Sequence, residues 1–378
     1  MTTFQALAIP KEKIFVWAFI PYKITEQGLI GEFYDHPGYR QELASVFAEL
    51  GIKWKWQPIT LDNMQAVVEE VVASNSEYTP VVLNYCDGFD EVDGYPGLSV
   101  IKLLEAKGII FTGADSNFEY LTISKIRMKQ ALVEAGVSTA PYEVISDVNK
   151  IGGICERLGT PLIVKPAIST GGIGLSSKSV VYSDEEIYQQ IQHLLKEQKE
   201  AQFTIGNIFV ERFINGREFT VFIVGSSQQP ENLKIYPTLE FIFHPSFPEF
   251  EKFKSHKIHL EVEDFLSGEL VTYPLIDKIC ELGKRAYYAV DGNGYGRVDI
   301  RMDQTSQELF VLEVNANCAI SSQPVSPLFE YGQTSVGTIL QQAGIPFPQL
   351  MSEIIAGAFT GKTPSFGKTK NQHEVFCF

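Results

Sequence analysis

The sequence predicts a multidomain protein that combines α/β and α+β architecture. Up to about residue 120, apolar strand-like runs alternate with segments of helical periodicity, which is typical of a parallel sheet with crossover helices. Beyond residue 207, long β-rich runs follow one another with few helices between them, which favours an antiparallel sheet. We therefore expect three domains, at 1–120, 121–206 and 207–378.

The first domain is expected to begin with a core strand. The run IFVWAFI at 14–20 follows two lysines, as a signal peptide would, but it is short and lacks a small-residue cleavage site. The further elements expected here are the helix 39–50, the strand 52–59, the helix 64–73, the strand 80–86, the helix 98–108 and the strand 109–114.

The second and third domains differ in how their strands are connected. In the second we expect the helix 125–136, the strand 141–145, the helix 150–159, the strands 161–166 and 178–182, and the helix 184–198. In the third, β-rich runs occupy 207–214, 217–224, 233–243, 295–303 and 308–316. The tail from 361 has little periodicity, and the sequence assigns it no role.

Composition and charge exclude several classes of function. The net charge of -15 argues against a nucleic-acid-binding face, which requires basic residues. Five cysteines without a C-x-x-C pair indicate neither disulfides nor a zinc site, and they favour a reducing, cytoplasmic location. No run approaches the roughly 18 apolar residues of a membrane-spanning helix.

The run YGRVDIRMDQTSQELFVLEVNAN carries the strongest chemical signal. If it folds as a hairpin with Asp299 opposite Glu313, then Arg297 stands opposite Asn315, and alternation places all four side chains on one face. Two carboxylates and an amide oxygen suit Mg²⁺ with bound phosphates, although an exposed hairpin face with an ordinary Arg–Asp pair would look the same. The opposite, apolar face would carry Val298, Ile300, Leu312 and Val314.

A lysine followed by glycines forms a second signal, in PLIVKPAISTGGIGLS. Lys165 ends the strand, and the backbone N–H groups of the following loop could fold over phosphate oxygens. Taken alone, a surface lysine before a glycine turn is the simpler interpretation. A third, weak signal is NIFVERFINGREF at 207–219, which we expect to be a hairpin that turns at Asn215 and Gly216, with Glu211 and Glu218 near a nucleotide.

In this order the motifs resemble those of the ATP-grasp enzymes, and among them the D-alanine–D-alanine ligase group. The resemblance is carried by YCDGFDEVDGYPGLSVIKLLEAKGIIFTGA, ISKIRMKQALVEAGV, PLIVKPAISTGGIGLS, FVERFINGREFTV, GRVDIRMD and FVLEVNAN, over roughly residues 80–325. It implies an N-terminal parallel α/β domain, called the pre-ATP-grasp domain, followed along the chain by an ATP-grasp fold. It also implies phosphorylation of a carboxylate by ATP, followed by attack of an amine on the acyl phosphate.

The resemblance also implies roles for particular residues. Asp299, Glu313 and Asn315 would bind two Mg²⁺ ions, with Mn²⁺ as a substitute, and Arg297 would stabilise the transition state. Ser322 is a further candidate catalytic residue. The residues implied to bind ATP are Lys125, Lys165, Gly171, Gly172, Gly174, Glu211, Arg212, Phe213, Ile214, Glu218, Lys252 and Lys254.

The acceptor half of the sequence departs from that group. Cys318 and Ala319 replace its Pro-Gly pair, and Pro324 and Val325 stand where a Ser-Leu pair would hold the second substrate. We therefore expect an amide-forming ligase for amino acids or a specialised metabolite, with small carboxylate and amine substrates. Alternatives are condensation of an amino acid onto a phosphorylated enol or ketone, a small-molecule kinase, and a non-catalytic ATP-binding regulator. A homodimer is expected from the resemblance alone.

Overall fold

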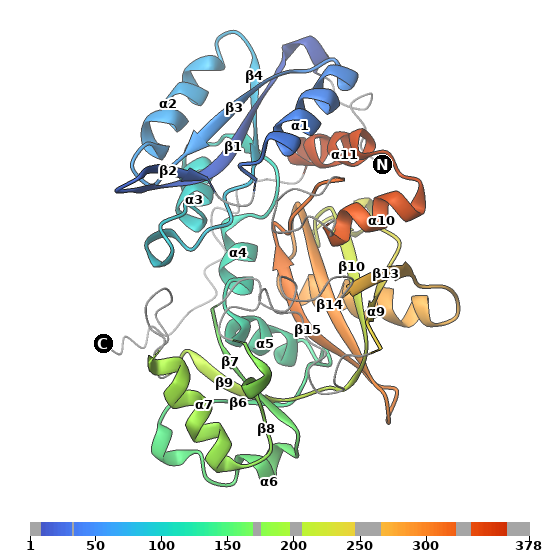
Figure 1. Cartoon of the computed structure of the whole chain (residues 1–378). Coiled ribbons are helices and arrows are strands. Elements are labelled where there is room, and N and C mark those ends of the chain that lie inside the picture. Colours follow the sequence, from blue (N-terminus) through green and yellow to red (C-terminus); the bar gives the residue numbers. More distant parts are fainter. Residues whose placement is uncertain are drawn as a thin grey trace.

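The computed structural model describes residues 9–31, 34–168, 175–196, 206–245, 266–322 and 334–360. They form three β-sheets with associated helices, of five, four and six strands. Figure 1 shows the five-stranded sheet at the top, the four-stranded sheet at the bottom and the six-stranded sheet at the side. The predicted mixture of α/β and α+β architecture is confirmed.

The N-terminal unit is a predominantly parallel sheet. Strand β1 pairs in parallel with both β3 and β4, and β4 pairs in parallel with β5, as the alternation of strands and helices predicts. After β1 the chain turns back at Gly28, whose φ of 113° favours glycine, and adds the antiparallel strand β2. The elements are β1 (Ile14–Thr25), β2 (Gly28–Gly31), α1 (Pro37–Leu50), β3 (Lys53–Ile59), α2 (Met64–Ser74), β4 (Thr79–Asn84), α3 (Leu98–Ala106) and β5 (Ile110–Phe111).

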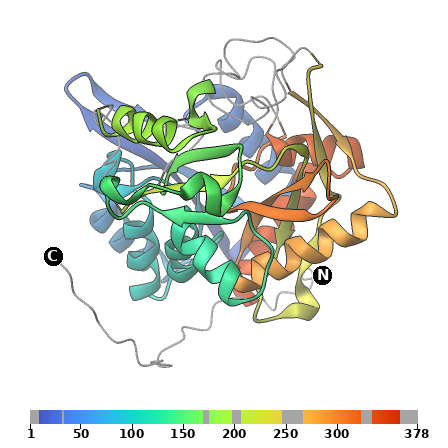
Figure 2. The same ribbon diagram turned by 90° about the horizontal axis from the view of Figure 1, so that it is seen from below.

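Two helices then lead into the four-stranded sheet, whose order is β6-β9-β7-β8. Helix α7 covers one face of this sheet, because Ile187, Ile191 and Leu194 pack against Leu162 and Val164 of β7; Figure 2 views the chain with this unit nearest the reader. The elements are α4 (Ser116–Thr122), α5 (Lys125–Glu134), β6 (Tyr142–Val144), α6 (Ile154–Leu158), β7 (Leu162–Pro166), β8 (Val180–Val181), α7 (Asp184–Lys196) and β9 (Ile208–Arg212).

The expected hairpin at 207–219 is wrong. Strand β9 pairs with β6 and β7, whereas the next strand, β10, pairs with strands of the six-stranded sheet. The two strands therefore lie in different sheets, with the loop 213–215 crossing between them. The three-domain division stays a proposal, and sheet membership would move its second boundary from 206 to this loop.

The C-terminal sheet has the order β13-β12-β10-β14-β15, with β11 beside β10. Its strands are antiparallel, as predicted, but the 15-residue helix α9 is an element that the strand pattern did not suggest. The elements are β10 (Gly216–Val224), β11 (Lys234–Ile235), β12 (Leu239–Phe243), β13 (Leu266–Leu270), α9 (Leu275–Ala289), β14 (Tyr295–Asp303), β15 (Leu309–Ala316), α10 (Ser335–Ala343) and α11 (Phe347–Thr360).

One face of this sheet is apolar and packs on α9. Ile279 and Ala286 of the helix lie in the same fully buried cluster as Val298, Ile300 and Val314 of the strands. Burying an isoleucine or valine side chain of this kind stabilises the fold by about 1.5–3 kcal/mol relative to leaving it in water. The opposite face of β10, β14 and β15 carries the polar residues of the candidate site.

A bulge in β15 sets which side chains reach that polar face. From Met302 to Ile300 the ladder pairs residues whose numbers add to 611, but it shifts between Asp299 and Ile300, so that Asp299 pairs with Glu313 and Ile300 with Val311. Leu312 is the extra residue of the bulge. The prediction that Leu312 faces the core is wrong, because Val311 takes that core position.

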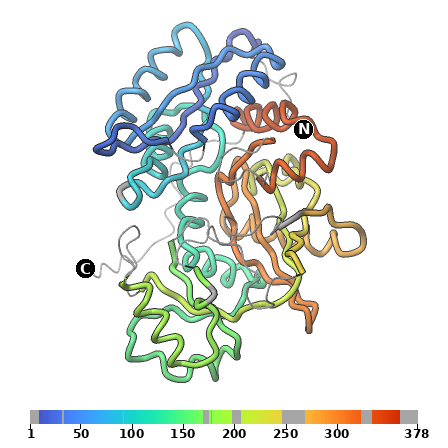
Figure 3. Tube along the Cα trace, viewed as in Figure 1, coloured from blue at the N-terminus to red at the C-terminus, as the bar shows by residue number. Residues whose placement is uncertain are grey.

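The last helix returns to the N-terminal unit. Helix α11 shares a buried cluster with α1 and with β1 and β4, and the colour gradient of Figure 3 shows this red segment beside the blue one. The N-terminal and C-terminal units also meet at two glycines. A side chain on Gly294, whose φ is 73°, would lie 2.0 Å from the carbonyl oxygen of Gly113.

Candidate active site

The centre of the candidate site is a hydrogen-bonded group on β14 and β15. Arg297 donates from Nε to Oδ1 and from Nη2 to Oδ2 of Asp299, each at 3.0 Å. The side-chain amide of Asn315 donates to Oδ2 of Asp299 at 3.2 Å, and Thr220 on β10 donates to Oδ1 at 2.7 Å. The predicted pairing of Arg297 with Asn315 and of Asp299 with Glu313 is confirmed.

Burial and neighbouring charge shift the pKa of Arg297 in opposite directions. Burial would lower the pKa of its guanidinium, but the adjacent carboxylate of Asp299 outweighs this effect, so that the pKa lies above its usual value. The side chain is 21% exposed, and its cation is held in place by a two-point contact. Such a fixed positive group can stabilise charge that develops on a reacting oxygen.

Glu313 joins the hairpin to the helix that precedes the four-stranded sheet. Its Oε1 lies 2.8 Å from Nζ of Lys125, the first residue of α5. The backbone N–H of Lys125 in turn donates to the carbonyl of Ala167, just after β7, at 2.7 Å. The contact brings together two predicted site residues that are 188 positions apart in the sequence.

Lys165 and Glu211 form a second ion pair, with Nζ and Oε1 2.6 Å apart. The register of β7 against β9 brings them together, since Ile163 lies opposite Glu211 and Lys165 is two residues further on. Glu211 also contacts Nζ of Lys129 at 2.6 Å. Burial alone would raise the pKa of Glu211, but the two ammonium groups outweigh it and hold the pKa at about 2.

The residues predicted to line the adenine edge lie at the end of β9 and just after it. Glu218 pairs with Arg301 across β10 and β14, and Arg301 also donates to the carbonyl of Ile214 at 3.1 Å. Phe213 is buried against Ile163. The guanidinium of Arg212 lies 5.4 Å from the ring centroid of Phe310.

Ser322 lies on the side where α1 meets the end of the β14–β15 hairpin. Its backbone N–H donates to Oε1 of Glu42 at 2.8 Å, its hydroxyl donates to the same carboxylate, and Ser321 donates to Oε2 at 2.8 Å. Nearby Cys318 is buried, and burial raises the pKa of its thiol to about 12 although Arg297 opposes this. The thiol is therefore a neutral, poorly nucleophilic group at neutral pH.

Asn317 ties the end of β15 to α4. Its Oδ1 accepts from the backbone N–H of Ala114 at 2.8 Å, and its Nδ2 donates to Oε2 of Glu119 at 3.0 Å. Burial, with a smaller effect of the charge of Asp90, raises the pKa of Glu119 to about 7, although the hydrogen bond from Asn317 opposes the shift. Glu119 is 5% exposed, so solvent screens these effects little.

This raised pKa predicts a pH-dependent stability. Folded protein binds the Glu119 proton more tightly than the unfolded chain, so the stabilisation is complete below pH 4.5 and is lost as the pH rises through about 7. In Glu119→Gln the group no longer titrates, and we expect the stability of the variant relative to wild type to increase by roughly 2–3 kcal/mol between about pH 5 and about pH 8. Urea unfolding at both pH values measures this difference, and Glu134→Gln, at an exposed position in the last turn of α5, serves as the control. A constant difference at the two pH values would contradict the buried-carboxyl interpretation.

The donor set of the hairpin fits a hard cation. The described residues contain no group of three or more His, Cys, Asp or Glu side chains placed to hold a metal ion. The predicted set is smaller, with the two carboxylates of Asp299 and Glu313 and the amide of Asn315. Each carboxylate is neutralised by a cationic side chain, and phosphate oxygens of a nucleotide would complete an oxygen shell of the kind that Mg²⁺ prefers.

Several predicted residues fall outside the described ranges. These are Gly171, Gly172 and Gly174 of the glycine loop, Lys252 and Lys254, Pro324 and Val325, and the tail 361–378. Their roles stay predictions.

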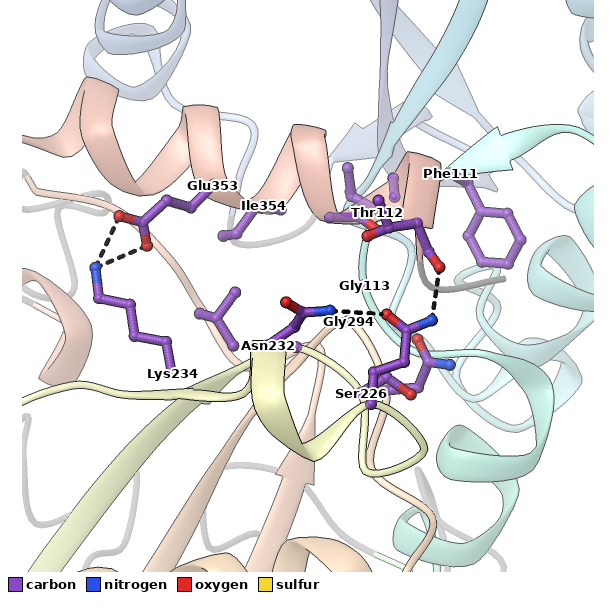
Figure 4. A pocket seen from close by; sticks show the side chains of 16 residues that line it. Phe111, Thr112, Gly113, Ser226, Asn232, Lys234, Gly294, Glu353 and Ile354 are labelled. Atoms are coloured by element: carbon purple, nitrogen blue, oxygen red, sulfur yellow. Dashed lines mark hydrogen bonds and ion pairs between the residues drawn. The ribbon is translucent and has the colours of Figure 1, made fainter. Parts of the chain in front are cut away.

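A separate pocket lies between the end of β5, the β10–β11 region and α11, as Figure 4 shows. Among the described residues that line it, none is a predicted site residue. One wall carries a Lys234–Glu353 ion pair of 2.7 Å.

Sequence patterns did not identify four residues that complete the site. Lys129 follows Lys125 by one helical turn, a spacing that indicates a shared helix face. Arg301 continues the period of two that begins at Arg297, but the pairing of β10 with β14, which also brings Thr220 to Asp299, is a long-range feature. No local sequence pattern identified Glu42 as a site residue, because α1 lies far along the chain from the serines that Glu42 contacts.

The fold and the comparisons with known proteins define an ATP-grasp protein of the ligase class. The family model described as D-ala D-ala ligase C-terminus matches residues 132–356, more than half of the chain. The chain belongs to this D-alanine–D-alanine ligase family. No described helix is long and apolar enough to cross a bilayer.

Curated relatives and solved structures agree with this assignment. The D-alanine–D-alanine ligase of Acinetobacter baylyi is 24% identical over 314 residues, which cover 80% of this chain and 92% of that enzyme. The enzyme of Bordetella petrii is 27% identical over 226 residues, covering 60% and 64%. The structure of the Bacillus anthracis D-alanine–D-alanine ligase complexed with ATP matches with a TM-score of 0.62 at 18% identity, covering 92% and 97% of the two chains. The VanG D-Ala:D-Ser ligase of Enterococcus faecalis matches with 0.61 at 17% identity, covering 92% and 99%.

Proposed function

We propose that the protein is an ATP- and Mg²⁺-dependent carboxylate–amine ligase that forms an amide through an acyl phosphate. The observation that carries this proposal is the single polar face on which Arg297, Asp299 and Asn315 are hydrogen-bonded beside the Glu313–Lys125 pair. A fixed cation next to paired carboxylates is suited to phosphoryl transfer, because charge must be neutralised both on the nucleotide and on the transferring group.

The proposed reaction has two steps. A carboxylate oxygen of the first substrate attacks the γ-phosphorus of ATP, the bond to the β-phosphate oxygen breaks, and ADP leaves. The amine of the second substrate then attacks the carbonyl carbon of the acyl phosphate, the C–O bond to phosphate breaks, inorganic phosphate leaves with the electron pair, and the amine nitrogen loses a proton. Lys125 and Lys165 would bind phosphates, and Arg297 would stabilise the charge that develops in both steps.

Asp299, Glu313 and Asn315 are proposed to hold the metal. When bound, Mg²⁺ neutralises phosphate charge and orients the oxygens for in-line transfer. We propose two ions, with Mn²⁺ as a substitute, since two carboxylates and an amide lie on the polar face where the triphosphate is proposed to bind. Glu211, Arg212, Phe213, Ile214 and Glu218 are proposed to surround the adenosine part, with the glycine loop and Lys252 or Lys254 closing over the phosphates.

The acceptor is proposed to differ from the second D-alanine of the named D-alanine–D-alanine ligases. Cys318 and Ala319 replace a Pro-Gly pair, and the hydroxyls of Ser321 and Ser322 are engaged by the carboxylate of Glu42. An acidic group beside these serines disfavours the binding of a substrate carboxylate there, because like charges repel at short range. An amino acid or specialised metabolite that presents a neutral or cationic group here fits this arrangement better, with Ser322 contacting it.

The reaction is tested by incubating the protein with ATP, Mg²⁺ and pools of amino acids and metabolites while phosphate release is measured. We expect release that depends on both a carboxylate and an amine, and a product whose mass equals the two substrates minus water. A product that has gained a phosphoryl group would instead identify a kinase, and the absence of turnover with any pool would favour a nucleotide-binding regulator. A D-alanine dipeptide as the main product would overturn the proposed acceptor.

The cellular setting follows from the same proposal. ATP use and the absence of cysteine pairing motifs favour the cytoplasm, and the family resemblance is the basis for a homodimer. Light scattering that gives a 42.3 kDa particle would exclude the dimer.

A further inference from the structure

A buried carboxylate lies between two lysines in the candidate nucleotide site. Glu211 is 1% exposed, and its oxygens lie 2.6 Å from Nζ of Lys165 and 2.6 Å from Nζ of Lys129. Two cations and one anion leave one net positive charge in this group.

The two lysines differ in their freedom to contact a ligand. Lys129 is fully buried, and its ammonium has two further acceptors, Thr139 Oγ1 at 2.8 Å and the carbonyl of Ala140 at 3.4 Å. These two hydrogen bonds and the ion pair with Glu211 hold the ammonium in place. Lys129 is therefore fixed within the protein and cannot turn toward a nucleotide without breaking these contacts.

Lys165 is placed differently. Its side chain is 16% exposed, and it lies near the end of β7, where the glycine loop begins. If Glu211 had only Lys165 as its partner, moving that ammonium toward a phosphate would leave a buried carboxylate without a cation, which is strongly unfavourable. Because Lys129 remains in contact with Glu211, the carboxylate stays neutralised when Lys165 moves.

We propose that Lys129 is a positioning residue that neutralises Glu211 and thereby leaves the charge of Lys165 available to nucleotide phosphates. This inference rests on the proposed ATP-dependent function. It assigns Lys129 no contact with the nucleotide. The effect of Lys129 is confined to the part of the binding energy that comes from the phosphate groups.

The test measures the binding of ADP and of adenosine by calorimetry. The dissociation constant of adenosine divided by that of ADP reports the phosphate contribution to binding. In Lys129→Met, we expect this ratio to fall by about tenfold or more, with the affinity for adenosine nearly unchanged. In the double variant Lys129→Met/Glu211→Gln, the carboxylate that would hold Lys165 is gone, and we expect most of the lost ratio to return. Glutamine keeps an acceptor oxygen for adenine, and Glu211→Gln alone provides the reference for this change.

Controls separate this effect from loss of structure. Lys234→Met removes the lysine of another Lys–Glu pair, outside the site, and should leave the ratio unchanged. In Lys129→Met, Glu211 still has Lys165 as its partner, so we expect this variant to fold. If the single variant does not fold, the double variant still allows the measurement, because it removes both charges of the buried pair. A ratio that stays at its wild-type value in Lys129→Met, or that does not recover in the double variant, would overturn the inference. If wild-type protein itself fails to bind ADP, the proposed function fails instead.

Discussion

Replacing Glu313 with glutamine is expected to lower turnover by about three orders of magnitude or more while the fold stays intact. Glutamine has nearly the same shape, but it lacks the charge that pairs with Lys125 at 2.8 Å and that a divalent ion would require. The loss should appear in kcat for phosphate release and in a higher Mg²⁺ concentration for half-maximal rate.

The control for this variant lies in the same hairpin. Glu308 is exposed in the turn between β14 and β15, so Glu308→Gln makes the same chemical change away from the polar face. We expect it to retain wild-type turnover. Near-normal activity of Glu313→Gln at saturating Mg²⁺ would remove Glu313 from the proposed metal site.

Arg297→Lys is expected to reduce kcat by about 100-fold or more with a much smaller effect on ADP affinity. Lysine keeps the charge but cannot reproduce the planar two-point contact in which Nε and Nη2 each lie 3.0 Å from an oxygen of Asp299. The cation would no longer be held where charge develops in the transition state. Steady-state kinetics with both substrates distinguish this from a binding defect, in which KM alone would rise.

An arginine outside the site provides the comparison. Arg217 makes a similar two-point contact with Glu240, at 2.6 Å for both bonds, but its side chain is 48% exposed. We expect Arg217→Lys to change kcat by less than about twofold, since exposed pairs contribute little. Equal losses in the two variants would indicate that substituting any paired arginine damages the sheet, and Arg297 would lose its assigned role.

Local patterns were sufficient to predict most individual elements and the polar face of the β14–β15 hairpin. Alternation within β14 and β15 is a property of each strand, and Arg297, Asp299, Glu313 and Asn315 share one face as expected. Helices such as α1 and α2 were similarly identified from their periodicity.

The partners of those elements depend on long-range contacts that no local pattern contains. The run 207–219 alternates like a hairpin, yet its first strand completes one sheet and its second strand enters another. The contact of Lys129 with Glu211 depends on how α5 packs on that first strand, 82 residues later. For the same reason Glu42 could not be connected to Ser322, which lies 280 positions away.

The position of Leu312 has a consequence for any attempt to shorten or transplant this hairpin. Near the turn the strands pair so that, with an unbroken ladder, Asp299 would face Leu312 and Arg297 would face Val314. Closing the bulge while all residues are kept would therefore turn the acid and the amide of β15 into the layer that packs on α9, and aliphatic side chains would replace them beside the arginine. Deleting Leu312 at the same time would instead keep Glu313 opposite Asp299. A redesign that removes the bulge must therefore also remove one residue, because Glu313 and Asn315 reach the polar face only if the extra residue is bulged out or absent.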